Sequence, residues 1–485
     1  MIGYIILGII AVLLSVILIK AAFFKYKPEE IEKLEDEHID SEKALKHLSE
    51  AISIKTISVD GDDGDYTEFY KFHEFLERSY PLVHKTMTKE VIGSASLLFY
   101  WEGKNPELNP IALMSHMDVV PVEAGTEKDW KEDPFGGKID REFIWGRGSL
   151  DMKNHLIAVM ESLEALIEDG YQPDRGVYVC FGQDEEISIG EQRGAARIAK
   201  TLRERGVRLD CIIDEGGTLI PINVAGIHTT FATVGASEKG YADYKITVND
   251  AGGHSSTPSK HTAIGKLGKV INRLDNHQSR AKLLPVTKEF MVRAGKALPY
   301  WARIIVGNLW FFKPLIMLVM KNIPTTATLV RTTQAATMCE GSPVPNVMPQ
   351  NASAVVNCRI LPGESTETTT AHLKKACGKN ASVELIGFSK EPAPVSPTSS
   401  RAYLTIEKLC KQIDPKAVAV PFLVMGCTDT CYYESICDTI FRFTPFVVTP
   451  ELLHTMHGTN ERLPIDSMGP AVAFFKRYVK TLTKD

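Results

Sequence analysis

Histidine and acidic residues recur in five short segments of the chain. The first segment, SHMD, contains His116 and Asp118, two positions apart. Residues two apart on a strand point to the same face, so both side chains can serve one site. A histidine that binds a metal usually has its other ring nitrogen held by a carboxylate or a carbonyl. On its own this segment is more typical of a local hydrogen-bonded pair. It indicates a metal site only in combination with the other four segments.

The second and third segments add carboxylates at the ends of predicted elements. GRGSLDMK places Asp151 after a glycine-rich loop at a helix start, where the alternative role of an Asp is to cap the helix. Glu185 and Glu186 directly follow the apolar run GVYVCFG. Adjacent carboxylates at a buried strand end repel each other unless a cation lies beside them. A pair of metal ions would supply that positive charge, and the alternative is a solvated surface turn.

The last two segments complete the set. IIDEGG places Asp214 at the end of a short apolar run, and HTMHGTNER contains His454 and His457. Imidazole and carboxylate groups are the usual non-thiolate ligands of zinc, and a bridging carboxylate can hold two ions about 3.5–4 Å apart. Histidines and carboxylates at strand ends and loops of one unit therefore predict a site for two zinc ions.

The elements that must position these side chains alternate between strand and helix. Pro110–His116, Gly176–Gly182 and Cys211–Asp214 are predicted as short buried strands, and a helix is predicted from Asp151 onward. Strands that alternate with helices indicate an α/β domain with a mostly parallel central sheet. In such a sheet, functional residues belong at the carboxyl ends of the strands.

A second unit interrupts this domain. YADYKITVND after Ser237 alternates like a half-exposed strand, a long helical region runs to about Lys321, and Asn351–Gly363 alternates again. We interpret this as an inserted α+β lid domain, after which Val418–Val424 returns to α/β character. The predicted domains are an N-terminal anchor and flank (1–27), a first catalytic segment (28–236), the lid (237–365) and a second catalytic segment (366–485).

The chain begins with an apolar run that differs from the rest. Ile2–Ile19 carries no charge, and 18 residues form a helix of about 27 Å, just long enough to span a bilayer. We predict an uncleaved single-pass anchor followed by a polar tether over Lys27–Lys43; the alternative is a buried core helix. The lysines after the span favour a cytoplasmic body, whereas sequons at Asn351 and Asn380 would permit an outside body. The net charge of -5 excludes a strongly basic nucleic-acid surface.

In order, SHMD, GRGxxDMK, EE, DEGG and HGTNER resemble the aminoacylase and carboxypeptidase family of co-catalytic zinc hydrolases, including its carboxypeptidase S and N-fatty-acyl-amino acid hydrolase branches. The resemblance covers nearly everything after the tether, and it implies a zinc-exopeptidase-like catalytic domain. It also implies roles for single residues: Asp151 bridges two zinc ions, His116 and Asp214 complete one site, Glu186 and His457 complete the other, Glu185 is the general base, and Asp118 orients His116.

The same resemblance implies substrate contacts. His254 of the lid would stabilise the oxyanion, and His454 would be structural. Relatives commonly have Arg or Ser where this chain has Cys431, which leaves Arg359 and Arg442 as the cations for a substrate carboxylate. The implied substrate-binding residues are Asn346, Arg359, Gly426 and Thr428.

These expectations support three hypotheses. The first is hydrolysis, or reversible formation, of the amide bond of N-acyl amino acids, with Ile304–Met320 lining an acyl groove; the alternative for that segment is a core helix pair. The second is a carboxypeptidase or dipeptidase that acts on small peptides with a free carboxylate. The third is a non-catalytic, membrane-anchored binding protein. An oligomer formed through the lid is compatible with each of them.

Overall fold

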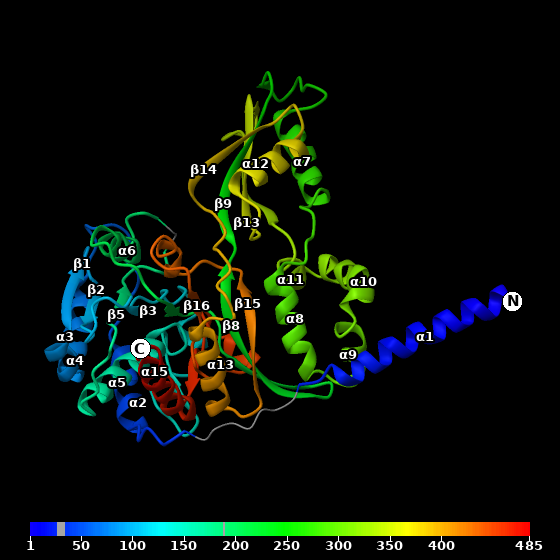
Figure 1. Ribbon diagram of the computed structural model, residues 1–485. Helices are drawn as coiled ribbons and strands as arrows, with labels where there is room; N and C mark the ends of the chain where they lie inside the picture. The colour runs from blue at the N-terminus through cyan, green and yellow to red at the C-terminus, as the bar shows by residue number, and fades with distance from the viewer. Residues whose placement is uncertain (27–33, 188–189) are drawn as a thin grey trace.

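The computed structural model describes residues 1–26, 34–187 and 190–485. Figure 1 shows a catalytic domain around a large sheet, an upright lid beside it, and the helix α1 (Ile2–Phe23) projecting away from both. The helix α1 is long and apolar enough to cross a membrane, and only 6% of its most apolar window is buried. The predicted boundary between residues 27 and 28, and the first part of the predicted tether, lie outside the described residues.

The catalytic domain is built on a nine-stranded sheet. Its central strands are parallel, because β3 pairs in parallel with β5 and β6, and β6 with β16, while β8 pairs in parallel with β15. Antiparallel strands flank this centre. The predicted α/β class with a mostly parallel centre is confirmed. The strand order is β1 (Thr88–Ile92), β2 (Ser96–Trp101), β5 (Val177–Gly182), β3 (Ile111–His116), β6 (Ile212–Asp214), β16 (Ile440–Arg442), β8 (Ile227–Glu238) and β15 (Ala417–Val424), with β7 (Leu219–Val224) paired to β8.

Helices cover both faces of this sheet. The larger apolar core includes side chains of α5 and α15 and of the strands, and a smaller core on the other side of the sheet includes α6. The predicted helix after Asp151 is α5, and it is buried along nearly its whole length because α2, α4 and α15 pack around it. The helices of this domain are α2 (Ser41–Ser53), α3 (Thr67–Ser79), α4 (Pro81–Thr86), α5 (Lys153–Glu168), α6 (Gly194–Glu204), α13 (Arg401–Ile413), α14 (Pro450–Leu453) and α15 (Met468–Leu482).

The lid has its own four-stranded antiparallel sheet and its own core. Burial alternates along β9 (Gly240–Asn249), as the sequence pattern predicted, because one face packs under α7 (Ala263–Asn276) and α12 (Thr366–Cys377). The strand order is β11 (Thr333–Glu340), β13 (Asn351–Ile360), β9 and β14 (Ser382–Lys390). Since α12 and β14 belong to this sheet and core, the lid extends to about residue 390, beyond the predicted end at 365.

Four more helices lie between the lid sheet and α1. The first, α8 (Pro285–Ala297), packs on β15 of the catalytic sheet. The next two, α9 (Tyr300–Val306) and α10 (Leu309–Asn322), meet at an angle of 94°, and α11 (Pro324–Ala327) follows them. The predicted long helical region is therefore a chain of separate helices, of which α9 contacts α1.

Candidate metal centre and substrate cavity

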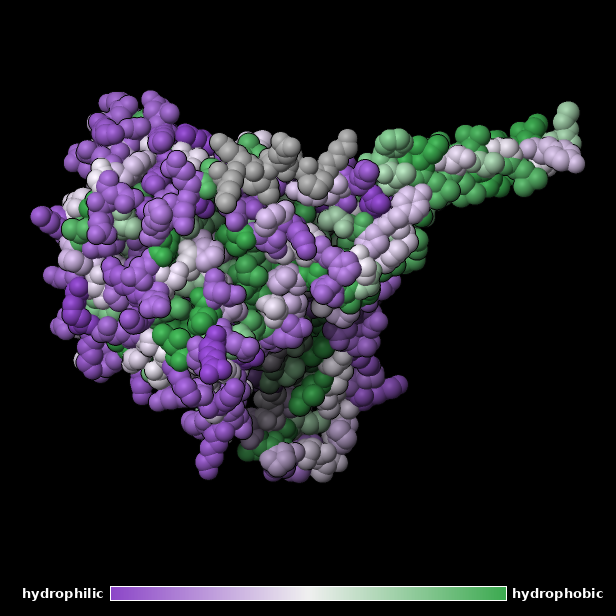
Figure 2. All heavy atoms as spheres, turned by 90° about the horizontal axis from the view of Figure 1, so that it is seen from below, coloured by the Kyte–Doolittle hydropathy of each residue, from purple (hydrophilic) through white to green (hydrophobic). Residues whose placement is uncertain are grey.

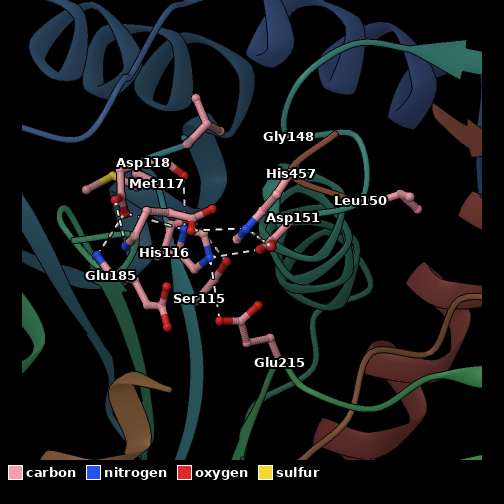
Figure 3. A network of polar contacts seen from close by, with 12 residues as sticks. Ser115, His116, Met117, Asp118, Gly148, Leu150, Asp151, Glu185, Glu215 and His457 are labelled. Carbon is pink, nitrogen blue, oxygen red and sulfur yellow. Dashed lines mark hydrogen bonds and ion pairs between the residues drawn. The ribbon is translucent and has the colours of Figure 1, made fainter. Parts of the chain in front are cut away.

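Asp151 lies at the centre of the predicted site, between two histidines (Figure 3). One carboxylate oxygen, Oδ1, is 3.1 Å from Nε2 of His116, and the other, Oδ2, is 2.9 Å from Nε2 of His457. Asp151 does not cap the following helix, because the N-cap position of α5 is Met152 and has no side-chain cap hydrogen bond. The carboxylate therefore presents one oxygen to each imidazole.

A buried glutamate holds the loop that presents Asp151. Glu461 Oε1 accepts hydrogen bonds from the backbone N–H groups of Gly148 and Leu150, both at 2.9 Å, and Oε2 lies 2.5 Å from the Arg147 guanidinium. The sequence analysis missed this role of Glu461 and Arg147. The sequence did contain a signal for this role. Arg147 belongs to the segment GRGSLDMK and Glu461 to HGTNER, and their contact joins these two distant segments of the domain.

Asp118 contacts both His116 and the two glutamates. His116 Nδ1 is 2.9 Å from the backbone carbonyl of Asp118, which can only accept, so this nitrogen carries the proton and Nε2 faces the cluster. The Asp118 carboxylate accepts from the backbone N–H groups of Glu185 and Glu186, each at 3.1 Å, and from the Ser58 hydroxyl at 2.6 Å. Asp118 therefore contacts His116 through its backbone carbonyl and both glutamates through its carboxylate, and its orienting role stays a prediction.

Glu185 and Glu186 do not form a solvated surface turn. The Glu186 side chain is 5% exposed and its Oε2 lies 3.1 Å from His457 Nε2, while its Oε1 has no hydrogen-bond partner among the residues that the structure describes. Burial and the neighbouring charge of Glu215 raise the pKa of Glu185 well above its ordinary value. A carboxyl group with a raised pKa is suited to taking and returning a proton near neutral pH.

The structure brings Glu215 to His116, whereas the sequence analysis chose its neighbour Asp214. Glu215 Oε1 lies 3.6 Å from His116 Nε2. Two sets of side chains have donor atoms that all lie within 4.8 Å of one another, and Asp214 belongs to neither among the described residues; the sets are His116, Asp151 and Glu186, and His116, Glu185 and Glu215. Asp214 is the last residue of β6, and Glu215, which follows the strand, is the one whose carboxylate lies near His116.

The donor set fits divalent cations. Burial and the charge of Asp151 raise the pKa of Glu215 to about 8, and hydrogen bonds to Asp151 and Glu186 raise that of His457 to about 10. Buried carboxylates of this density need positive charge, which protons or metal ions can supply. The Oε1 of Glu186, which has no partner within the described part of the chain, is one available ligand atom, and two imidazoles with several carboxylates match the preferences of zinc.

A cavity of about 730 Å³ opens beside this cluster and takes residues from both the catalytic domain and the lid. Arg359 of β13 lies in it, with its guanidinium 4.8 Å from the centre of the Tyr241 ring. Arg442 does not line it, because that side chain is 1% exposed and paired with Glu238 at 2.9 Å. The cavity-lining residues include Asp151, Glu185, Glu186, Glu215, Arg359, Gly426, Thr428, Cys431 and His457.

Some predicted substrate contacts lie elsewhere. His254 belongs to β10 (Gly253–His254) and is exposed, and Asn346 precedes β12 (Val347–Met348), which pairs with β10. Among the described residues, neither of them lines the cavity. The segment Ile304–Met320 also contributes no described residue to it, and the expected acyl groove along that segment stays a prediction. Nor is that segment wholly core, since Trp310 is 54% exposed.

Several known proteins are similar to this chain over most of its length. The model of "Peptidase family M20/M25/M40" matches residues 112–481. A probable carboxypeptidase S-like protein of Dictyostelium discoideum is 36% identical over 98% of this chain and 93% of its own length. An N-fatty-acyl-amino acid synthase/hydrolase of Mus musculus is 32% identical over 92% of this chain and 88% of its own length.

The fold has a similar solved structure. An M20 family metallo-carboxypeptidase from Sulfolobus solfataricus superposes with a TM-score of 0.67, covering 91% of this chain and 99% of that one, at 17% identity. That likeness concerns the fold, while the family match spans most of the catalytic domain and the whole lid. With its histidines and carboxylates gathered at the strand ends of an α/β sheet, this chain belongs to the M20/M25/M40 family of peptidases and is a hydrolase of the metallopeptidase type.

Proposed function

We propose that the chain is a hydrolase with two zinc ions that cleaves an amide bond next to a free carboxylate. The observation that carries the proposal is the placement of Asp151, whose two oxygens face His116 and His457 separately. A carboxylate in that position would hold both ions. His116 and Glu215 would complete one ion's ligands, and Glu186 and His457 the other's.

Glu185 has the position and the protonation behaviour of the general base. It lines the cavity beside the cluster, its backbone is fixed by Asp118, and its pKa is raised by burial. Zinc bound at the cluster would act as a Lewis acid and lower the pKa of water. Glu185 then takes the proton from the attacking water and returns it to the leaving amine, which an amide needs in order to break.

Arg359 is the cation placed to bind the substrate carboxylate. It lies in the cavity, its guanidinium is 4.8 Å from the centre of the Tyr241 ring, and the alternative Arg442 is paired with Glu238. A planar guanidinium binds a carboxylate through two parallel hydrogen bonds, which would orient the substrate. Arg359→Lys should therefore raise KM strongly, because lysine keeps the charge but loses this geometry.

The substrate class that we propose is an N-acyl amino acid, because the synthase/hydrolase relative matches over most of both chains. A carboxypeptidase acting on small peptides is the second candidate, favoured by the relative that is 36% identical. A hydrolysis panel with purified, zinc-loaded protein separates the two. Higher kcat/KM for acyl amino acids over dipeptides with the same C-terminal residue supports the first, and the reverse order supports the second.

Metal content tests the ligand set independently of the substrate. We expect Glu215→Ala to lose about one of two bound zinc ions, whereas Asp214→Asn, which keeps the shape of the strand end, retains both. Elemental analysis of the two purified variants after dialysis measures this. Loss of zinc from the Asp214 variant alone would return the role to Asp214.

We also propose that α1 anchors the protein in a membrane. Its 22 residues have a mean hydropathy of 3.0 in the best window, and most of its side chains are exposed. Retention of the protein in membranes after alkaline extraction, together with an intact N-terminus by mass spectrometry, supports an anchor. A shortened N-terminus would show that the segment is a cleaved signal sequence.

A further inference from the structure

The lid helices α9 and α10 display apolar side chains that no part of the described chain covers (Figure 2 shows the similarly exposed α1 as an apolar rod). One face of α10 is used internally, since Ile316 and Met320 join a small core with Val330. The opposite face is exposed although it is equally apolar. The exposed large side chains of the two helices and the residue after them are Tyr300, Trp301, Ile305, Trp310, Phe311, Leu315, Leu318, Val319 and Ile323.

A helix that is apolar all round is stable only when something apolar covers it. In a soluble protein an exposed apolar surface of this kind marks an interaction site. The charged residues of this segment indicate which kind of partner it binds. From Tyr300 to Ile323 the chain contains Arg303, Lys313 and Lys321 but no acidic residue. Basic and aromatic residues around an apolar face are typical of helices that lie at a membrane surface.

A second feature next to this surface also favours an anionic lipid surface. A cavity of about 720 Å³ beside α10 is lined by the apolar side chains of Leu283, Met317 and Leu318 and by cations. Only one of the four cations has an acidic partner among the described residues, namely Lys282 with Glu364 at 2.8 Å. The four cations are Arg280, Lys282, Lys313 and Lys321.

The position of α1 fixes where a membrane would be. Asn308 donates to the backbone carbonyl of Ile17 at 3.0 Å, and Tyr300 donates to that of Leu18 at 3.0 Å, so the last turns of α1 are attached to α9 and α10. The Lys20 ammonium, which ends the apolar run of α1, lies 6.0 Å from the centre of the Trp310 ring. Trp310 is therefore at the depth where an apolar span ends, and tryptophan is enriched at that depth in membrane proteins.

We propose that α9 and α10 lie in the surface layer of the same lipid bilayer that α1 enters, with their exposed apolar face among the acyl chains and their cations at the headgroups. In Figure 1, α10 lies on the side of the lid toward which α1 projects, and the catalytic domain lies on the other side. The lid thereby stands between the membrane and the catalytic sheet. This inference rests on the proposed anchoring of the protein by α1, and it does not depend on the reaction at the metal centre.

Tryptophan fluorescence tests the proposal in the full chain. The protein has five tryptophans, of which Trp301 and Trp310 are 61% and 54% exposed, and the other three are at most 9% exposed. The full chain is reconstituted into vesicles of phosphatidylcholine with a minor share of phosphatidylserine. Part of the phosphatidylcholine carries bromine, placed either near the headgroup or near the end of the acyl chain. Bromine quenches only tryptophans that it contacts, so we expect quenching, stronger with bromine near the headgroup.

Matched variants assign the signal. Trp301→Phe with Trp310→Phe keeps the apolar surface, and it should remove most of the quenching while activity is unchanged. The control Trp101→Phe replaces a buried tryptophan and should leave the quenching intact. Absence of quenching in the parent protein overturns the proposal and leaves another occupant, such as a second copy of the chain. Stronger quenching from the end of the acyl chain also overturns it, because the helices would then form a broken span.

Discussion

The buried pair of Glu461 and Arg147 gives the sharpest quantitative prediction. Glu461 is 0% exposed and Arg147 2% exposed, and the glutamate also accepts from the backbone of the loop that carries Asp151. Glu461→Ala leaves a buried guanidinium without its partner and strips backbone N–H groups of their acceptor. Removal of one partner of a buried ion pair typically costs about 3–5 kcal/mol. This is a large part of the typical stability of a domain.

The matched variant is Glu461→Gln, which keeps one oxygen for the backbone donors but removes the charge. We expect it to lose less stability, about 1.5–3 kcal/mol, because only the charged part of the hydrogen bonding disappears. Burial raises the pKa of Glu461 to about 7, so the comparison is made at pH 8, where the carboxylate is ionised.

Thermal unfolding of the detergent-purified proteins, followed by circular dichroism, is the assay. The Tm should fall by several degrees in Glu461→Ala and by less in Glu461→Gln. Bound zinc should fall too, since the loop of Asp151 loses its support. A Tm of the alanine variant within one degree of the parent, with full zinc content, would refute the idea that this pair holds the loop.

Three further predictions concern single side chains. Glu185→Gln should keep bound zinc but lower kcat by at least about 10²–10⁴-fold, since it removes proton transfer; comparable kcat would exclude it as the base. His457→Ala should lower the zinc content measured by elemental analysis, and His454→Ala should not; the opposite pattern would exchange their roles. Burial lowers the pKa of His73 to about 4. Between pH 6.5 and 4 the unfolded chain therefore binds the proton more readily than the folded chain, and the free energy of unfolding decreases as the pH is lowered. His73→Gln should reduce this loss of stability by up to about 2 kcal/mol at pH 5, measured as urea midpoints at pH 7 and pH 5. An unchanged loss would show that His73 is not its cause.

Much of the catalytic domain could be predicted because its signals are local. The strands β3, β5 and β6 are short apolar runs, and a residue of the candidate site lies at, or a few positions after, the end of each strand. The choice between His454 and His457 followed the family motif, and His457 lies in contact with Asp151 and Glu186. For these strands and for this histidine, the prediction needed only residue order and spacing.

The parts that were missed depend on geometry that spacing does not contain. Asp214 and Glu215 are adjacent carboxylates, and the exact point where β6 ends decides which one faces His116. The place of His254 depends on how the lid is oriented as a whole, and no local pattern specifies that. The lid continues past residue 365 because Leu373 is buried under a distant strand, which is a long-range contact.

The chain leaves the catalytic domain for the lid and then returns to it. The catalytic domain can therefore be completed only after the lid has been synthesised. The neighbouring parallel strands β8 and β15 are separated in sequence by the entire lid, with Thr230 paired to Ala417. Joining such distant segments carries a loop-closure cost and slows folding. His457 also lies after the lid, whereas the other proposed ligands precede it. A nascent chain that ends anywhere before its last thirty or so residues therefore carries an open sheet or an incomplete metal centre, and activity has to wait for the C-terminus.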